Sequence, residues 1–191
     1  MAKRYEQLLG LIDNLKPKKI VEVGVHTALR GAAMCMKALE HRSAVEYVGY
    51  DIFELADSKF HEDALNGKGM PDQEKARNRL RAIGGLTHSF VIGDTRETLG
   101  GQTVKADFAF IDGDHRVDAI RSDYAALAGC KCVVFDDYYR PGQDGKIPDL
   151  KMYGANAVVD ELAAAGRRVE ILSVADICKH GGFSHLAVVW K

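Results

Sequence analysis

The sequence predicts an α/β fold: a doubly wound sheet of seven strands that is mostly parallel and has an antiparallel last strand. Short apolar runs alternate with segments of helical periodicity along the chain, as they do when helices cover both faces of a parallel sheet. Four successive runs close on an acid, with the endings Glu-x-Gly, Tyr-Asp, Gly-Asp and Ile-Asp. Because the carboxyl ends of parallel strands share one rim, where open sheets bind ligands, these acids indicate a site at that rim.

Seven short apolar runs bounded by polar residues are the predicted strands. They cover residues 19–24, 46–51, 88–94, 107–111, 131–135, 169–174 and 185–190. The run at 107–111 is an unbroken series of Phe, Ala and Ile after its first residue, which is typical of a strand buried on both faces. The last two runs flank Gly181-Gly182, and that turn predicts a hairpin between them.

Five segments with apolar residues on one side are the predicted helices. They cover residues 5–15, 27–40, 72–83, 117–127 and 156–165. Thr27 is the expected N-cap of the second helix, and Gly166 closes the fifth. Residues 52–70 and 138–153 are rich in glycine, proline and polar side chains, so both are expected to be long loops at the rim.

Composition narrows the class of protein. A chain of 191 residues is most simply one domain, residues 1–191, with a substantial core. Its 26 basic and 27 acidic residues give a net charge of −1, which argues against a nucleic-acid partner. No apolar run approaches the ~20 residues that span a bilayer, and the N-terminus lacks the apolar stretch of a secretory signal. The expectation is a cytoplasmic protein with no membrane partner; a homo-oligomer is compatible with it.

Acids and one histidine follow the fourth and fifth predicted strands directly. If these strands are neighbours, the side chains that converge at one edge are Asp112, Asp114, His115, Asp136 and Asp137. So many carboxylates repel one another unless a cation or the donors of a ligand offset their charge. The sequence therefore predicts a binding site at this edge.

The end of the first predicted strand, Glu22-Val23-Gly24, leads into a helix whose first N–H groups are open to a ligand. Gly24 lets the chain turn and a ligand approach closely. The stretch is no dinucleotide fingerprint, because His26 and Leu29 stand where later glycines belong. By itself this motif is explained equally well by a simple strand-to-helix turn.

The ends of the second and third predicted strands suit a nucleoside. Asp51 stands about 27 residues after Gly24, where an acid can accept hydrogen bonds from both ribose hydroxyls. Gly93, Asp94 and Thr95 could receive the exocyclic amine of adenine. Each acid alone is also explained as a helix cap or turn residue. Taken together, the three spacings favour a nucleoside-binding rim.

These motifs resemble those of the class I S-adenosylmethionine-dependent methyltransferases, which have a Rossmann-like sheet. Within that class the chain is similar to the metal-dependent small-molecule O-methyltransferases of the macrocin and catechol type. The resemblance rests on residues 21–24, 47–51, 92–95, 110–115 and 134–138. It implies cofactor contacts from Glu22, Gly24 and His26 to methionine, from Asp51 to ribose, and from Gly93, Asp94, Thr95 and Asp112 around the adenosyl group. The chain departs from the family at Ala28, where a second glycine is common.

The resemblance also implies a divalent cation, usually Mg²⁺, bound by Asp112, Asp136 and Asp137. Oxygen ligands suit such a hard cation, which lowers the pKa of a bound hydroxyl. Asp112 and His115 are the implied catalytic residues, with His115 as the general base. A helix-capping role explains His115 equally well. Asp114 could support the site or replace Asp112 as a ligand.

The predicted function is transfer of the methyl group of S-adenosylmethionine to a hydroxyl of a small molecule, such as a natural product or sugar, assisted by a metal. Three alternatives stay open. One is a non-catalytic nucleoside-binding or assembly subunit, and another is an NAD-dependent oxidoreductase. The third is metal-dependent hydrolysis at the aspartate cluster.

Overall fold

The computed structural model describes residues 2–56, 70–141, 154–178 and 182–191. Its strands are β1 Lys19–Val23, β2 Val45–Asp51, β3 Leu86–Ile92, β4 Phe108–Ile111, β5 Cys132–Arg140, β6 Arg168–Ile171, β7 Asp176–Ile177 and β8 Phe183–Trp190. Its α-helices are α1 Arg4–Leu15, α2 Leu29–Leu39, α4 Gln73–Arg81, α5 Thr95–Thr98, α6 Val117–Leu127 and α7 Gly154–Ala164. A 3₁₀ turn, η1, covers Phe53–Leu55.

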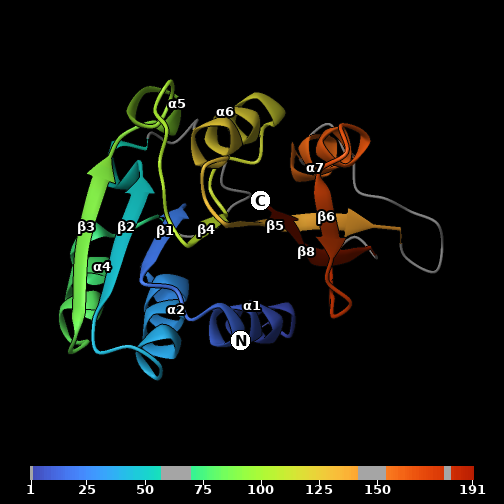
Figure 1. Cartoon of the computed structure of the whole chain (residues 1–191). Coiled ribbons are helices and arrows are strands. Elements are labelled where there is room, and N and C mark those ends of the chain that lie inside the picture. The colour runs from blue at the N-terminus through green and yellow to red at the C-terminus, as the bar shows by residue number, and fades with distance from the viewer. Residues whose placement is uncertain (1, 57–69, 142–153, 179–181) are drawn as a thin grey trace.

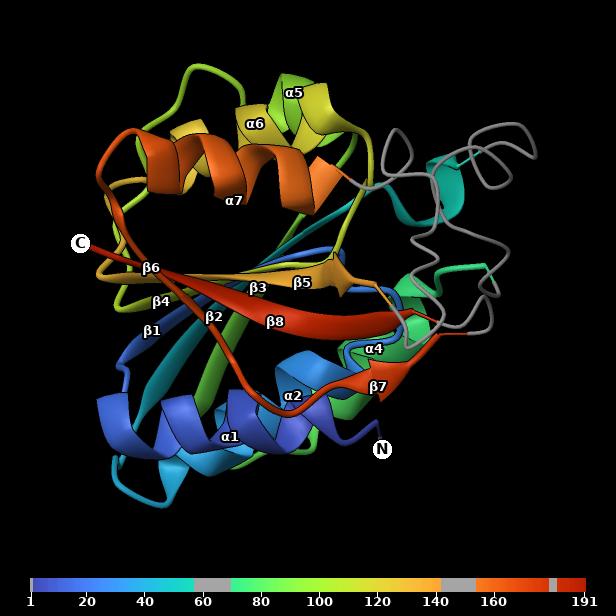
Figure 2. The same cartoon turned by 90° about the vertical axis from the view of Figure 1, so that its right-hand side faces the viewer.

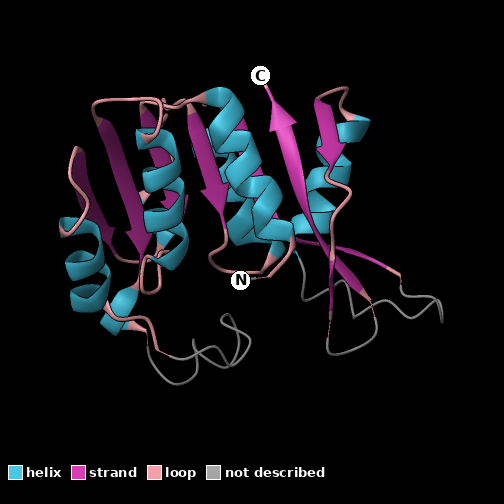
Figure 3. Cartoon of the chain, turned by 90° about the horizontal axis from the view of Figure 1, so that it is seen from below, coloured by secondary structure: helices cyan, strands magenta, loops and turns pink. Residues whose placement is uncertain are grey.

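One twisted sheet lies between two layers of helices (Figure 1). The strands follow the order β3-β2-β1-β4-β5-β8-β6, and β7 pairs with β8 beside this path. Helices α1, α2 and α4 cover one face, whereas α5, α6 and α7 cover the other (Figure 2). Figure 3 shows the strands side by side behind the layer that contains α1.

The predicted fold class is confirmed. Strands β1 to β5 are parallel to one another, and β8 is antiparallel to β5 and to β6. Within the described residues the sheet has eight strands rather than seven, because the two-residue β7 also pairs with β8. A strand this short carries no periodicity that the sequence could reveal.

Strand β5 is longer than predicted. It was expected to end at Phe135 and give way to a loop from residue 138, but it continues to Arg140. Strand β8 supplies the pairing beyond the rim, with Tyr139 opposite Ser184. The register shifts between Phe135 and Tyr138, and Asp137 has a φ of 55°. Such a bulge redirects consecutive side chains. Residues 142–153 of the expected loop lie outside the described residues.

Helix α2 begins later than predicted, and Thr27 is not its N-cap. The N-cap position belongs to Ala28, which has a left-handed φ of 53° and makes no side-chain cap. The methyl group of Ala28 is fully buried and belongs to the core cluster on the α1 and α2 face of the sheet. The side chain of Ala28 therefore lies in the core.

The core has two parts, one on each face of the sheet. The part under α1 and α2 includes Leu8, Ile12 and Tyr47, while the part under α6 and α7 includes Leu127 and Val158. Within the described part of the chain, no helix combines the length and the apolarity needed to cross a lipid bilayer. Burial on both faces fixes β1 and β4 at the centre and holds their carboxyl ends side by side.

Candidate functional site

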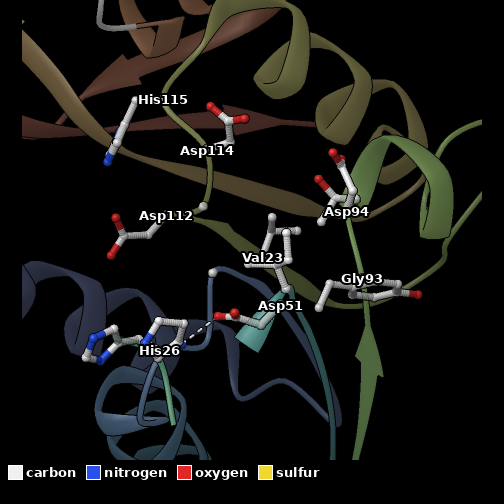
Figure 4. Close-up of a pocket in the computed structure, with 14 residues that line it drawn as sticks. Val23, His26, Asp51, Gly93, Asp94, Asp112, Asp114 and His115 are labelled. Carbon is white, nitrogen blue, oxygen red and sulfur yellow. Dashed lines mark hydrogen bonds between the residues drawn. The ribbon is translucent and has the colours of Figure 1, made fainter. Parts of the chain in front are cut away.

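A pocket opens at the carboxyl ends of β1, β2, β3 and β4 (Figure 4). Its lining residues are Val23, Gly24, His26, Tyr50, Asp51, Ile52, Pro71, Gly93, Asp94, Thr95, Asp112, Gly113, Asp114 and His115. The structure thus brings together most of the predicted cofactor residues. Three predicted site residues, Glu22, Asp136 and Asp137, are not among those that line the pocket.

Gly24 is the point at which the loops after β1 and β4 meet. Its φ is +87°, and a Cβ at this position would lie 2.0 Å from the carbonyl oxygen of Asp112. The backbone N–H of Asp112 donates to the carbonyl of Val23 at 2.8 Å, which extends the pairing of the two strands to the rim. The missing side chain is therefore needed for the approach of two backbones, in addition to any approach by a ligand.

Asp51 lies at the end of β2 and is 92% buried, with 8% of its surface exposed. One carboxylate oxygen accepts the N–H of His26 at 2.7 Å, and the other accepts the N–H of Phe53 at 2.7 Å. Burial raises the pKa of this carboxyl, and the backbone N–H groups partly offset that rise. His26 has a φ of 53°, which turns its N–H toward the acid. The acid is thus fixed in direction by backbone donors.

Asp94 is the N-cap of α5 and pairs with Arg96, two residues later. Its carboxylate accepts the N–H of Arg96 at 2.9 Å and pairs with the Arg96 guanidinium at 2.5 Å. These contacts lower the pKa of Asp94. Asp114 repeats the pattern with Arg116, whose N–H lies 2.9 Å from a carboxylate oxygen of Asp114. Asp94 therefore has the capping role that the sequence left open, and both acids face the pocket.

Glu22 points away from the pocket, into the core beneath α2. It is 1% exposed and accepts a hydrogen bond from the hydroxyl of Tyr47. Burial raises the pKa of this carboxyl to about 8. Gly31 of α2 leaves room for the pair, since a Cβ there would lie 2.6 Å from a Glu22 oxygen. Alternation along β1 explains the placement, because Val23 faces the pocket and its neighbour must face the opposite side.

A second group of polar side chains extends the pocket toward β5. Ligand atoms of Asp112, His115 and Asp137 all lie within 4.8 Å of one another. The Nδ1 atom of His115 is 3.8 Å from a carboxylate oxygen of Asp137, and both residues are buried. Ser184 of β8 donates to Asp137 at 2.9 Å. Two carboxylates and an imidazole at this spacing can hold a divalent cation or move a proton.

Asp136 is directed toward α1 and is already satisfied. Its Oδ1 accepts from Arg4 Nε at 2.8 Å and from the N–H of Asp137 at 2.9 Å. Its Oδ2 accepts from Arg4 Nη2 at 3.1 Å and from the hydroxyl of Tyr5 at 2.5 Å. A carboxylate offers about four acceptor positions, so these donors fill them. Burial opposes ionisation of Asp136, but the charge of Arg4 outweighs it and lowers the pKa.

Arg4 and Tyr5 are the site residues that the sequence did not reveal. Both lie in the first turn of an ordinary amphipathic helix, 132 and 131 residues before Asp136. Nothing in their local pattern indicates a partner so far along the chain. The packing of α1 against β8 brings them to the rim.

Comparison with known proteins gives a match in structure alone. No family model matches the sequence, and no curated protein matches it significantly. Among solved structures, the O-methyltransferase TomG of Streptomyces achromogenes, in complex with S-adenosylmethionine, is 19% identical with a TM-score of 0.63 over 100% of this chain and 81% of its own. A Bacillus cereus O-methyltransferase in complex with S-adenosylhomocysteine is 16% identical, with a TM-score of 0.60 and coverage of 100% and 82%.

A third similar structure, a putative O-methyltransferase of Klebsiella pneumoniae, is 17% identical with a TM-score of 0.62, and the alignment covers 100% of this chain and 80% of that one. Identities this low establish shape rather than activity. The strand order, the antiparallel β8 and these neighbours agree. The chain has the fold of the class I S-adenosylmethionine-dependent O-methyltransferases.

Proposed function

We propose that this chain is an S-adenosylmethionine-dependent methyltransferase that methylates a hydroxyl group of a small molecule with the help of a divalent cation. The observation that carries the proposal is the pocket at the carboxyl ends of β1 to β4, with the buried Asp51 on one side and the group of Asp112, His115 and Asp137 on the other. Two of the structural neighbours contain S-adenosylmethionine or its demethylated product, which supports this choice of cofactor.

The residues of the pocket fit an adenosyl group. Asp51 is held by backbone donors at the end of β2, and a carboxylate in that place can accept hydrogen bonds from ribose hydroxyls. Asp94 and Thr95 line the pocket beyond β3, where an adenine ring can lie. When bound, S-adenosylmethionine supplies a methyl group made reactive by its sulfonium. The protein must align the acceptor and remove a proton.

Asp112 and Asp137 are the proposed cation ligands, since the oxygens of Asp136 are taken by Arg4, Tyr5 and a backbone N–H. Two carboxylates suffice for Mg²⁺, which keeps several waters. A bound cation lowers the pKa of an acceptor hydroxyl. His115 lines the pocket beside Asp137 and takes the proton as general base. A carboxylate oxygen of Asp137 lies 3.8 Å from the Nδ1 atom of this imidazole.

Calorimetry and thermal shift test the cofactor. Both S-adenosylmethionine and S-adenosylhomocysteine are expected to bind with micromolar affinity, while NAD at the same concentration has no effect, because the loop at Gly24 lacks the later glycines of a dinucleotide site. Stabilisation by NAD and none by either adenosyl compound would refute the proposal and favour an oxidoreductase.

Turnover tests the reaction. A panel of phenols, sugars and macrocyclic alcohols is incubated with S-adenosylmethionine and Mg²⁺, and methylated products are detected by mass spectrometry. Product that forms with Mg²⁺ and disappears on chelation supports the full proposal. Cofactor binding without product from any acceptor class indicates a nucleoside-binding subunit instead. Phosphoester cleavage without cofactor indicates hydrolysis.

A further inference from the structure

Arg4 is the centre of an ion-pair network that joins both ends of the chain to the rim. Its guanidinium contacts Asp136 at 2.8 Å, Asp137 at 3.2 Å and Asp176 at 3.0 Å. Asp176 of β7 also accepts the N–H groups of Lys3 and Arg4, at 2.8 Å and 3.2 Å. The side chain of Arg4 is only 13% exposed. This arginine therefore has a fixed position, unlike a solvated surface charge.

The charges of the cluster explain what the guanidinium does. Asp136, Asp137 and Asp176 all pair with the Arg4 guanidinium, and Asp136 is buried. Two ionised carboxylates side by side in a buried bulge repel strongly unless one is neutralised. Arg4 grips Asp136 with two nitrogens and touches Asp137 with only one of them. The two members of the acid pair therefore have unequal environments.

The bulge in β5 separates the same two acids in space. Asp136 faces α1 and meets Tyr5, whereas Asp137, with its φ of 55°, lies beside His115. A regular strand would also send neighbours to opposite faces, but the bulge keeps both at the rim. Arg4 and Tyr5 hold the first acid in place, and that in turn determines where the second one lies.

We propose that Arg4 is a positioning residue that acts as a built-in cation: it reserves Asp136 for the N-terminal helix and leaves Asp112 and Asp137 as the carboxylates that bind a divalent ion. The inference rests on the proposed function only for the presence of a cation site. It makes the acid pair functionally asymmetric, with Asp137 a ligand and Asp136 an anchor. It also makes Arg4 a competitor of the divalent ion for Asp136.

Direct measurement of Mn²⁺ binding, by calorimetry and electron paramagnetic resonance with no other substrate present, tests this asymmetry. Asp137→Asn is expected to weaken binding about 10-fold or more, and Asp136→Asn to leave it within about 3-fold. Arg4→Met is expected to bind Mn²⁺ about 10-fold more tightly, because the ion gains a third carboxylate. Mn²⁺ should then raise the Tm of Arg4→Met by more than it raises that of the wild type.

Arg121→Met is the matched control. It removes an arginine that pairs with Glu161 on the surface, so its Mn²⁺ affinity should equal that of the wild type. If Arg4 has only a structural role, Arg4→Met will have a lower Tm than the wild type but will not bind the ion more tightly. That result overturns the inference. Equal loss of affinity in Asp136→Asn and Asp137→Asn overturns it as well.

Two further results separate the inference from the proposed function. If the wild type binds no Mn²⁺ while Arg4→Met does, the cation of the proposed reaction is refuted, and Arg4 stands confirmed as its replacement. If neither protein binds the ion, the inference fails too. Should Arg4→Met not fold, Arg4→Lys replaces it: an ammonium makes fewer contacts than the fork of the guanidinium, so Mn²⁺ binding should again tighten, and unchanged binding counts against the proposal.

Discussion

The two sides of the pocket are built in different ways. On the proposed adenosyl side, defined by Gly24, Asp51 and Asp94, acids are held by donors that lie no more than 25 residues away in the sequence, most of them backbone N–H groups. On the proposed acceptor side, defined by Asp112, His115 and Asp137, the arrangement depends on Arg4 and Ser184, which lie 133 and 47 residues from Asp137. One side is fixed by local turns and the other by tertiary packing.

This difference teaches how each side can fail. A backbone donor stays in place as long as the strand and its turn exist, so the adenosyl side should tolerate changes elsewhere in the molecule. Side-chain ion pairs between distant elements depend on the docking of both elements. The acceptor side should therefore respond to substitutions in α1 and β8, while cofactor affinity remains nearly constant.

The largest expected effect belongs to the acceptor side. His115→Asn should lower kcat by about 10²- to 10³-fold, because it removes the proposed general base, and should leave the Kd of S-adenosylmethionine unchanged. Stopped-time assays with saturating acceptor measure kcat, and calorimetry measures the Kd. His41→Asn, at an exposed histidine paired with Asp13, is the control. A parallel loss of cofactor affinity in His115→Asn means that the two sides are not separable.

Asp51→Asn is the reciprocal change on the adenosyl side. The NH₂ group of asparagine cannot accept a hydrogen bond from one of the two backbone N–H donors. The side chain therefore loses its fixed orientation as well as its charge. Cofactor affinity should fall by roughly 30- to 100-fold, the effect of about 2–3 kcal/mol from charged hydrogen bonds. Calorimetry checks this, with Asp13→Asn on the surface as control. A large fall in kcat at saturating cofactor, with Kd unaltered, contradicts the assignment of Asp51 to the adenosyl side.

Gly24→Ala tests the contact between the two sides. The added methyl group would lie 2.0 Å from the carbonyl oxygen of Asp112, at a φ of +87°, so the free energy of unfolding should fall by about 2 kcal/mol. Urea unfolding measures it. Gly10→Ala is the control, since nothing lies within 4 Å of its Cβ and it stands inside α1, where alanine is favoured by about 0.5–1 kcal/mol. Equal stability of the two variants would show that the loops do not meet.

The smallest expected effect concerns Glu22, which lies outside both sides. Its pKa is raised to about 8 in the folded protein, against an ordinary value of 4.5. Between these values the unfolded chain has lost the proton that the folded chain keeps, so stability declines as pH rises. Gln does not titrate. Between pH 5 and pH 7.5 the free energy of unfolding of Glu22→Gln should therefore fall by at least about 1 kcal/mol less than that of the wild type. Urea melts at several pH values measure it, and an unchanged slope contradicts the buried neutral acid.

The same contrast explains how far the sequence could predict the structure. The end of β2 and the turn at Gly24 follow from local patterns, and so does the meeting of Asp51, Asp94 and Asp112 at one rim, because the order of parallel strands places their carboxyl ends together. The direction of Asp136 does not follow, because it depends on a bulge and on Arg4. The orientation of Glu22 was missed for a simpler reason: alternation along β1 sends it to the face opposite Val23.

The network around Arg4 has a consequence for synthesis of the protein. Its members span residues 4 to 176, so the ribosome must translate through residue 176 before all of these ion pairs can form. The adenosyl side needs only the first 112 residues or so for its contacts. During synthesis, the contacts of the proposed adenosyl side are therefore complete before those of the proposed acceptor side.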